Sequence, residues 1–339
     1  VCSSDLGKIF AQAASGEFAM KIGVVISGGD VSGINNFIFQ IARLTQAEIT
    51  LFNGGIPGLL EKKHNEIDWR DLVDFSIASI PIITSGRTTR KLVRSEYETI
   101  AKKLKSLRID VLVMAGGDGS LQFLNTLSEF DVNCFGVGMT IDNDVYGSDY
   151  SIGFSTACEQ IIKEVSRLRN TGRALPGRVF MVEVLGGYCG ELTLQSAIKS
   201  NADIALIPEC QIPIDELSQR IKDRLASQNS VVILCSEGYT REYTPGFQGA
   251  IDTMMKQLEP RIGVRIRKTI IGYGLRNGDP TCEEIYQGTI MASEVVRCIQ
   301  SGMKNKAIII NSSNKPIPID LVSMKKRLVR SEERRVGKE

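Results

Sequence analysis

The sequence predicts an α/β protein with two lobes, each built on a mostly parallel sheet. Short apolar runs rich in β-branched residues alternate with amphipathic helical stretches, as in strands joined by crossover helices. Clusters of glycine and aspartate follow several of these runs, where parallel strands would end. The length of 339 residues exceeds one typical domain and suits two.

The apolar runs define the expected strands in order along the chain. These are residues 21–27, 49–53, 110–115, 134–138, 178–185, 204–207, 230–236, 268–272 and 307–311. Helical periods are expected between them, at residues 34–45, 97–107, 155–169, 215–227 and 283–301. In residues 215–227, for example, Leu217, Ile221 and Leu225 share one stripe while charges occupy the other positions.

Composition excludes several classes of protein. The net charge of +2 gives no global attraction to nucleic acid or anionic lipid, and no apolar stretch approaches the roughly 20 residues of a membrane helix. The 8 cysteines form no CxxC pairs, which argues against a zinc site and for a reduced, cytoplasmic compartment. The only histidine, His64, is expected in a solvated loop. Acid–base chemistry would therefore need a carboxylate.

The two ends of the chain differ from the rest. Residues 1–6 and 330–339 can be back-translated into common sequencing-adapter DNA, and residues 7–19 are polar without a periodic pattern. We therefore expect residues 1–19 to be a non-native or disordered leader and residues 330–339 to be an artefactual tail, and we base the fold prediction on residues 20–329.

The first candidate site follows the first strand. Residues 28–33 (Gly-Gly-Asp-Val-Ser-Gly) precede a helix, so their backbone can approach an anion at a helix N-terminus. A tight strand–helix turn explains the same pattern. Residues 116–120 (Gly-Gly-Asp-Gly-Ser) repeat the arrangement and place small residues around Asp118, which suits Mg²⁺ shared with phosphate oxygens. The alternative is that Asp118 caps a helix.

The strongest local pattern is Thr-Ile-Asp-Asn-Asp at residues 140–144, after another strand. Asp142 and Asp144 lie two residues apart, so each disfavours the ionised form of the other, which can raise one pKa toward that of a general base. An Asx-rich turn is the alternative. Arginines in or beside loops could bind phosphate with their guanidinium forks, or simply be solvated: Arg87, Arg90, Arg178, Arg267 and Arg276.

These motifs together resemble the ATP-dependent 6-phosphofructokinase family. The resemblance rests on residues 21–30, 116–120, 140–144, 147–154, 182–184 and 186–190, in order and with similar spacing, and it extends from about residue 21 to residue 301. It implies two Rossmann-like lobes. Residues 20–152 plus 276–305 would form the larger, ATP-binding lobe, and residues 153–275 plus 306–329 the smaller, sugar-phosphate lobe.

The resemblance also implies a role for particular residues. Asp142 would be the base that deprotonates the 1-hydroxyl of fructose 6-phosphate, with Thr140 and Asp144 beside it, and Asp118 would be the Mg²⁺-linked carboxylate. Other positions match residues that bind ATP (Gly28, Arg87, Gly117, Gly119 and Ser120), the sugar (Gly186 and Glu237), its 6-phosphate (Arg178, Arg267 and Arg276, two of them reaching a neighbouring subunit) and effectors (Arg43 and Arg169). A cytoplasmic homo-oligomer, either tetramer or dimer, would follow.

Some positions bear on the donor and on activity. Gly119 and Met139 favour ATP, because pyrophosphate-using members of the family carry Asp and Lys there, whereas Phe123 stands where ATP-dependent members often keep a small residue near adenine. Gly187 stands where the family usually has an arginine, and Tyr273 stands where the family usually has a histidine. Removing one hydrogen-bond donor to the charge that develops in the transition state typically raises the activation free energy by about 3 kcal/mol, which lowers the rate about a hundredfold. A non-catalytic regulatory paralogue and a kinase with another donor or acceptor are therefore alternatives.

Overall fold

The computed structural model describes residues 20–61, 63–88, 90–239 and 250–324. The expected leader at 1–19 and tail at 330–339 lie outside these residues. The chain divides into two compact units. The first runs to Ser155 and resumes at Gly278, and the second covers residues 156–277.

The first unit contains a seven-stranded sheet in the order β11-β10-β5-β4-β1-β2-β3. Its strands are β1 (Lys21–Ser27), β2 (Glu48–Phe52), β3 (His64–Ile67), β4 (Val111–Gly116), β5 (Cys134–Gly138), β10 (Lys306–Ile310) and β11 (Pro316–Asp320). The five inner strands are parallel, while β3 and β11 pair antiparallel at the two edges.

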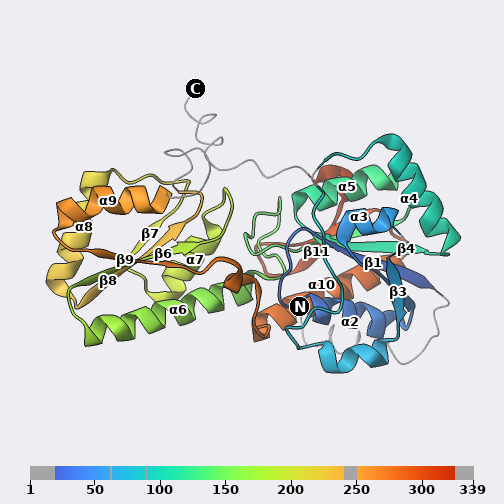
Figure 1. Cartoon of the computed structure of the whole chain (residues 1–339). Coiled ribbons are helices and arrows are strands. Elements are labelled where there is room, and N and C mark those ends of the chain that lie inside the picture. The colour runs from blue at the N-terminus through green and yellow to red at the C-terminus, as the bar shows by residue number, and fades with distance from the viewer. Residues whose placement is uncertain (1–19, 62, 89, 240–249, 325–339) are drawn as a thin grey trace. The chain divides into compact units, whose positions relative to one another are not determined.

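Helices cover both faces of this sheet (Figure 1). One face carries α3 (Gly55–Leu60), α4 (Arg94–Ser106) and α5 (Asp118–Ser128), and the other carries α2 (Ile34–Thr45) packed against α10 (Cys282–Gln300). The 3-10 turn η1 (Trp69–Phe75) packs against α2, and η3 (Leu321–Ser323) packs against α5. Residues Ile22 to Ser27 of β1 are all buried, which explains why this strand is a continuous apolar run instead of an alternating one.

The second unit contains a parallel four-stranded sheet in the order β7-β8-β6-β9. Its strands are β6 (Arg178–Val184), β7 (Ile204–Leu206), β8 (Ser230–Ser236) and β9 (Ile266–Ile270). In Figure 1, α8 (Ile214–Ser227) and α9 (Ala250–Ile262) lie on one face, and α6 (Phe154–Ala174) and α7 (Glu191–Ser200) on the other, with η2 (Gly272–Arg276) after β9. Leu217 and Ile221 are fully buried against β6 and β8, as their stripe predicts.

Three expectations about the elements were wrong, and one strand was missed. His64 lies in edge strand β3, with its ring 5.7 Å from that of Phe52, and not in a solvated loop. Residues 306–320 belong to the first sheet and not to the smaller lobe, because β10 pairs with β5. The strand expected at 268–272 is β9, which ends at Ile270. Strand β11 was missed because it contains two prolines, Pro316 and Pro318, which weaken a strand pattern.

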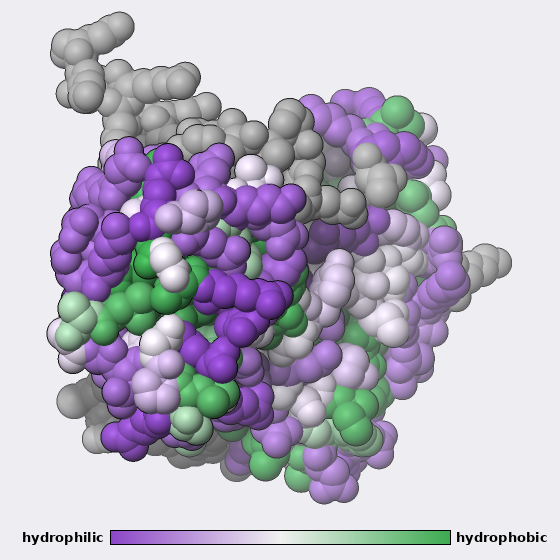
Figure 2. All heavy atoms as spheres, turned by 60° about the vertical axis from the view of Figure 1, so that its left-hand side comes forward, coloured by the Kyte–Doolittle hydropathy of each residue, from purple (hydrophilic) through white to green (hydrophobic). Residues whose placement is uncertain are grey.

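Within the described ranges, none of the helices is long and apolar enough to cross a bilayer. Hydrophilic residues cover most of the face shown in Figure 2, with smaller groups of hydrophobic residues among them.

Candidate active site

Three candidate loops leave neighbouring strands at the same edge of the first sheet. In the sheet register, Ser27 of β1 lies opposite Gly116 of β4, and Gly116 lies opposite Gly138 of β5. Because these strands are parallel, the loops that follow them start side by side. The structure thus brings together the sequence-predicted residues around Gly28, Asp118 and Asp142.

The loop after β1 is bound to a second loop that carries Arg87. Gly28 has a φ of 111°, its N–H donates to the Gly86 carbonyl at 3.2 Å, and its own carbonyl accepts from Ser85 Oγ at 3.0 Å. Arg87 is exposed directly after Gly86. These contacts place the backbone next to Arg87 beside the loop that leads into α2. The sequence indicated Arg87 but not the contacts of Ser85 and Gly86.

Asp118 is the first residue of α5, and the N-cap position belongs to Gly117. The Asp118 carboxylate accepts a hydrogen bond from the Tyr146 N–H at 3.1 Å, so it contacts the loop that contains residues 140–144. A Cβ atom added at Gly117 or Gly119 would meet nothing within 4 Å, whereas the buried Ser120 packs back on the sheet, with its Oγ 3.4 Å from the Ser27 carbonyl. Open space therefore adjoins the backbone on both sides of Asp118, at Gly117 and Gly119.

The loop at residues 140–144 is a hydrogen-bonded turn. The Asp142 N–H donates to Thr140 Oγ1 at 3.2 Å, and the Asn143 side chain donates to the Asp149 carbonyl at 3.1 Å. Asn143 has a φ of 52°, a backbone conformation that asparagine tolerates well. Asp142 and Asp144 are both half-buried. The turn that was the alternative interpretation thus exists, and it positions the two carboxylates at the sheet edge.

The donor groups of this edge fit Mg²⁺ better than a metal held entirely by protein. Among the described residues no group of three or more His, Cys, Asp or Glu side chains could hold a metal ion. Mg²⁺ commonly takes one or two protein carboxylates and leaves its other positions to water and phosphate. Asp118, with open space at Gly117 and Gly119, matches that requirement.

In the second unit, Gly186 and Glu237 meet at the carboxyl ends of β6 and β8. The Glu237 carboxylate accepts from the N–H of Gly187 at 2.8 Å and from that of Gly186 at 3.3 Å. Gly187 has a φ of 60°, in the left-handed region that favours glycine. Burial, and then the nearby charge of Glu237, raise the pKa of Glu183, while Lys268 opposes the shift. The hydrogen bonds from the N–H groups of Gly186 and Gly187 to Glu237 hold the loop that follows β6 in place.

The arginines expected to bind the 6-phosphate do not all lie at this edge. Arg178 is the first residue of β6, and Arg267 lies opposite Phe180 in the register, so both point to the same face near the amino ends of the strands. Gly186 and Glu237 follow the carboxyl ends. Arg276 is in η2, its guanidinium 6.0 Å from the ring centroid of Tyr273, which is 78% exposed. Within one chain the set is divided between two edges of the sheet.

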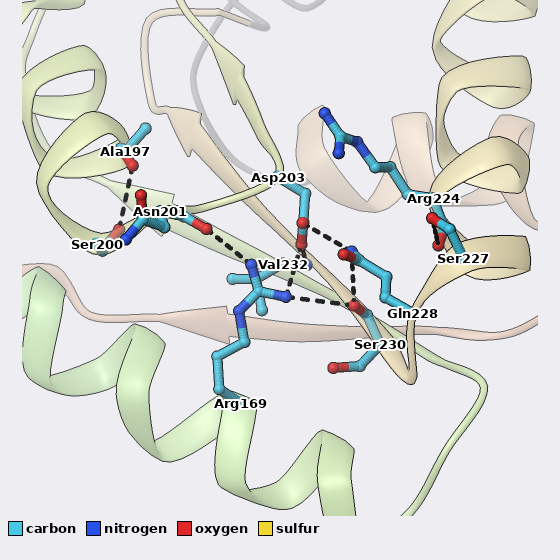
Figure 3. A network of polar contacts seen from close by, with 10 residues as sticks. All are labelled: Arg169, Ala197, Ser200, Asn201, Asp203, Arg224, Ser227, Gln228, Ser230 and Val232. Carbon is cyan, nitrogen blue, oxygen red and sulfur yellow. Dashed lines mark hydrogen bonds and ion pairs between the residues drawn. The ribbon is translucent and has the colours of Figure 1, made fainter.

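Arg169 takes part in a network inside the second unit (Figure 3). Its guanidinium forms an ion pair with the Asp203 carboxylate at 2.9 Å and donates to the carbonyls of Asn201 at 2.8 Å and Ser230 at 3.3 Å. These partners lie at the amino ends of β7 and β8. The contacts give Arg169 a structural role that the sequence did not predict, and the effector role of Arg169 and Arg43 stays a prediction.

Phe123 is 5% exposed and stacks on Tyr97 of α4, with ring centroids 5.3 Å apart. It belongs to the hydrophobic core between α4, α5 and the sheet. Its ring is thus accounted for by core packing.

The fold and the first-unit loops define an α/β protein whose sheet edge is built from glycine, aspartate and arginine, groups that suit phosphorylated ligands. The phosphofructokinase family pattern matches residues 21–299, so the chain belongs to the phosphofructokinase family.

The chain is similar to phosphofructokinases both in sequence and in structure. The chain is 31% identical to an ATP-dependent 6-phosphofructokinase of Clostridioides difficile, covering 88% of this chain and 92% of the relative. It is 31% identical to one of Finegoldia magna, with 94% and 98% covered. The crystal structure of Pichia pastoris phosphofructokinase in the T-state matches with a TM-score of 0.81 and 25% identity, covering 91% of this chain but only 38% of that longer chain.

Proposed function

We propose that this protein transfers the γ-phosphoryl group of ATP to the 1-hydroxyl of fructose 6-phosphate, giving fructose 1,6-bisphosphate and ADP in glycolysis. Membership of the family and the names of its relatives support this reaction. The observation that carries the proposal is the hydrogen bond between Asp118 and Tyr146. It joins the carboxylate proposed to hold the metal to the loop that contains the proposed base.

Asp142 acts as the general base in this proposal. It takes the proton of the 1-hydroxyl as the sugar oxygen forms a bond to the γ-phosphorus and the bond from that phosphorus to the β–γ bridging oxygen breaks, so that ADP leaves. A positioned base contributes roughly 10²–10⁴ in rate. The hydrogen bond from the Asp142 N–H to Thr140 Oγ1 holds this residue in its turn. Phosphoryl transfer otherwise needs positioning and charge neutralisation, which Arg87 would supply beside Gly28.

Asp118 would hold Mg²⁺ together with water and the phosphates of ATP. When bound, the ion neutralises negative charge on the triphosphate. The Asp118 carboxylate lies at the N-terminus of α5, and the chain's own contribution there is an open, glycine-lined edge that admits the phosphates at Gly117 and Gly119.

The second unit would bind the sugar phosphate, with Glu237 and Gly186 at the hydroxyls and Arg276 at the 6-phosphate. Arg178 and Arg267 lie toward the opposite edge of the same sheet, which supports the proposal that they serve the site of a neighbouring copy. The active protein is then a homo-oligomer. With no cysteine pairs at metal or redox spacing in its sequence, we place it in the cytoplasm.

A coupled assay tests this proposal on the purified full chain with fructose 6-phosphate and Mg²⁺, comparing ATP with pyrophosphate as donor. Product from ATP alone supports both donor and acceptor, and product from pyrophosphate alone would refute the choice of donor. The absence of product from either would favour a regulatory paralogue, the second candidate, which the left-handed Gly187 in place of an arginine specifically motivates.

A further inference from the structure

A buried carboxylate on α10 has no part in the proposed chemistry. Glu284 has 0% exposure in the first turn of the helix, and the Thr281 hydroxyl caps its N–H at 3.1 Å. Burying an ionisable carboxyl group is expensive unless other groups compensate for the lost water. Its contacts therefore indicate what the carboxyl group does.

Glu284 contacts the turn that closes the Asp142 loop. Its Oε1 accepts the Gly153 N–H at 2.6 Å. The preceding residue, Ile152, accepts from the Thr140 N–H at 3.1 Å and donates to the Gly138 carbonyl at 2.9 Å. The backbone at the start of the loop of Thr140 and Asp142 is thus hydrogen-bonded to Ile152. The N–H of the next residue, Gly153, is bound by Glu284.

The same side chain contacts the end of the other candidate loop. A Cβ atom added at Gly33, the N-cap of α2, would lie 2.5 Å from the Glu284 Cγ, so the side chain packs directly on this glycine. Gly153 in turn packs on Val31 of the same loop, since its added Cβ would lie 2.5 Å from Val31. Burial and the charge of Glu284 also raise the pKa of Tyr150 well above its usual value.

We infer that Glu284 is a positioning residue that fixes the loop at 28–33 and the loop at 140–144 relative to each other. The Glu284 side chain packs on Gly33 at the end of the loop at 28–33. Its carboxyl group also accepts the N–H of Gly153, in the segment that is hydrogen-bonded to the start of the loop at 140–144. The inference rests on the proposed function in one respect, namely that the first loop holds the donor phosphates and the second holds the base. A displacement of about 1 Å between such groups can lower a rate about a hundredfold.

Two substitutions separate the reach of the side chain from its ability to ionise. Glu284→Gln keeps an oxygen at the same reach but cannot ionise, whereas Glu284→Asp keeps a carboxyl group and withdraws its oxygen from Gly153. We expect E284D to lower kcat at least about tenfold with a smaller change in KM for ATP. E284Q should remain within about fivefold of the unchanged protein, since the glutamine amide oxygen can still accept the Gly153 N–H.

Val295→Ala is the matched control, because Val295 is a fully buried residue of the same helix outside these contacts. It should lower the melting temperature without lowering kcat at a temperature well below unfolding. Equal kcat values for E284D and E284Q, or a loss in V295A as large as that in E284D, would overturn the inference.

Amide hydrogen exchange gives a readout that does not depend on turnover. E284D should exchange faster than E284Q and V295A in peptides covering residues 28–33 and 139–153, while peptides of β10 and β11 stay unchanged. If the unchanged protein phosphorylates nothing, the proposed function fails and this comparison still decides the role of Glu284. Identical exchange in both loops for all three variants would refute it.

Discussion

The network around Asp203 allows a quantitative prediction of stability for the second unit (Figure 3). The Asp203 side chain is 6% exposed, and its carboxylate accepts from the Val232 N–H at 2.7 Å and from Gln228 Nε2 at 2.7 Å, besides its ion pair with Arg169. It therefore connects α6, the start of β7 and the start of β8. The perturbation is Asp203→Ala.

The magnitude follows from which groups lose their partner. Val232 is fully buried, and an unpaired buried N–H costs about 1–3 kcal/mol. The Arg169 side chain is 30% exposed and keeps its two carbonyl partners, so solvent screening limits its loss to about 1 kcal/mol. Gln228 keeps its 3.0 Å bond to the Ser230 carbonyl. Together these terms give about 2–4 kcal/mol.

Native-state hydrogen exchange measures this loss locally, which matters because the chain has two units. A loss of about 3 kcal/mol corresponds to exchange about a hundredfold faster in peptides of β7 and β8. Trp69, the only tryptophan in the sequence, lies in the first unit, so its fluorescence should be unchanged. Asp223→Ala on the exposed face of α8 removes the same charge and should leave exchange unaltered. An increase below about threefold in D203A would refute the reasoning.

Three further predictions concern the proposed base Asp142, the carboxyl group of Glu183 and the buried thiol of Cys235. Asp142→Ser should lower kcat by about 10²–10⁴ while calorimetry shows ATP binding nearly unchanged; an unaltered kcat would exclude Asp142 as the base. Because burial and Glu237 raise the pKa of Glu183, its ionised form destabilises the folded state above the ordinary carboxyl pKa. Glu183→Gln should therefore raise the melting temperature at pH 7 and have no effect well below pH 4.5, where the group is protonated in both states. Burial raises the pKa of the Cys235 thiol, so iodoacetamide at pH 8 should label the exposed Cys210 faster than the buried Cys235. Equal labelling rates of these two cysteines would contradict this prediction.

The sequence predicted the inner strands because they are buried on both faces. Such strands are continuous apolar runs, like residues 111–116, and they can be identified without knowing their neighbours. Edge strands β3 and β11 are half-exposed, polar or proline-containing, and they form strands only because β2 and β10 offer hydrogen-bonding partners. Residues 306–320 were expected in the smaller lobe, and this was wrong for the same reason, since the pairing of β10 with β5 is a long-range contact.

The chemistry of the candidate site could also be identified from short motifs. Asp118, Asp142 and Gly28 each follow a strand, and the end of a parallel strand is a position that the local sequence defines. Glu284 could not be found in this way. It stands in an ordinary first turn of a helix, more than a hundred residues from either loop that it contacts.

The sequence alone determined the α/β class, the order of the inner strands along the chain and the residue types at their ends, because these depend on local periodicity and backbone preference. The tertiary structure decided which strand ends are neighbours, which arginines share an edge and which buried groups hold the loops. Those features depend on pairing and burial between segments far apart in the chain, and such contacts leave no mark in the local pattern of either segment.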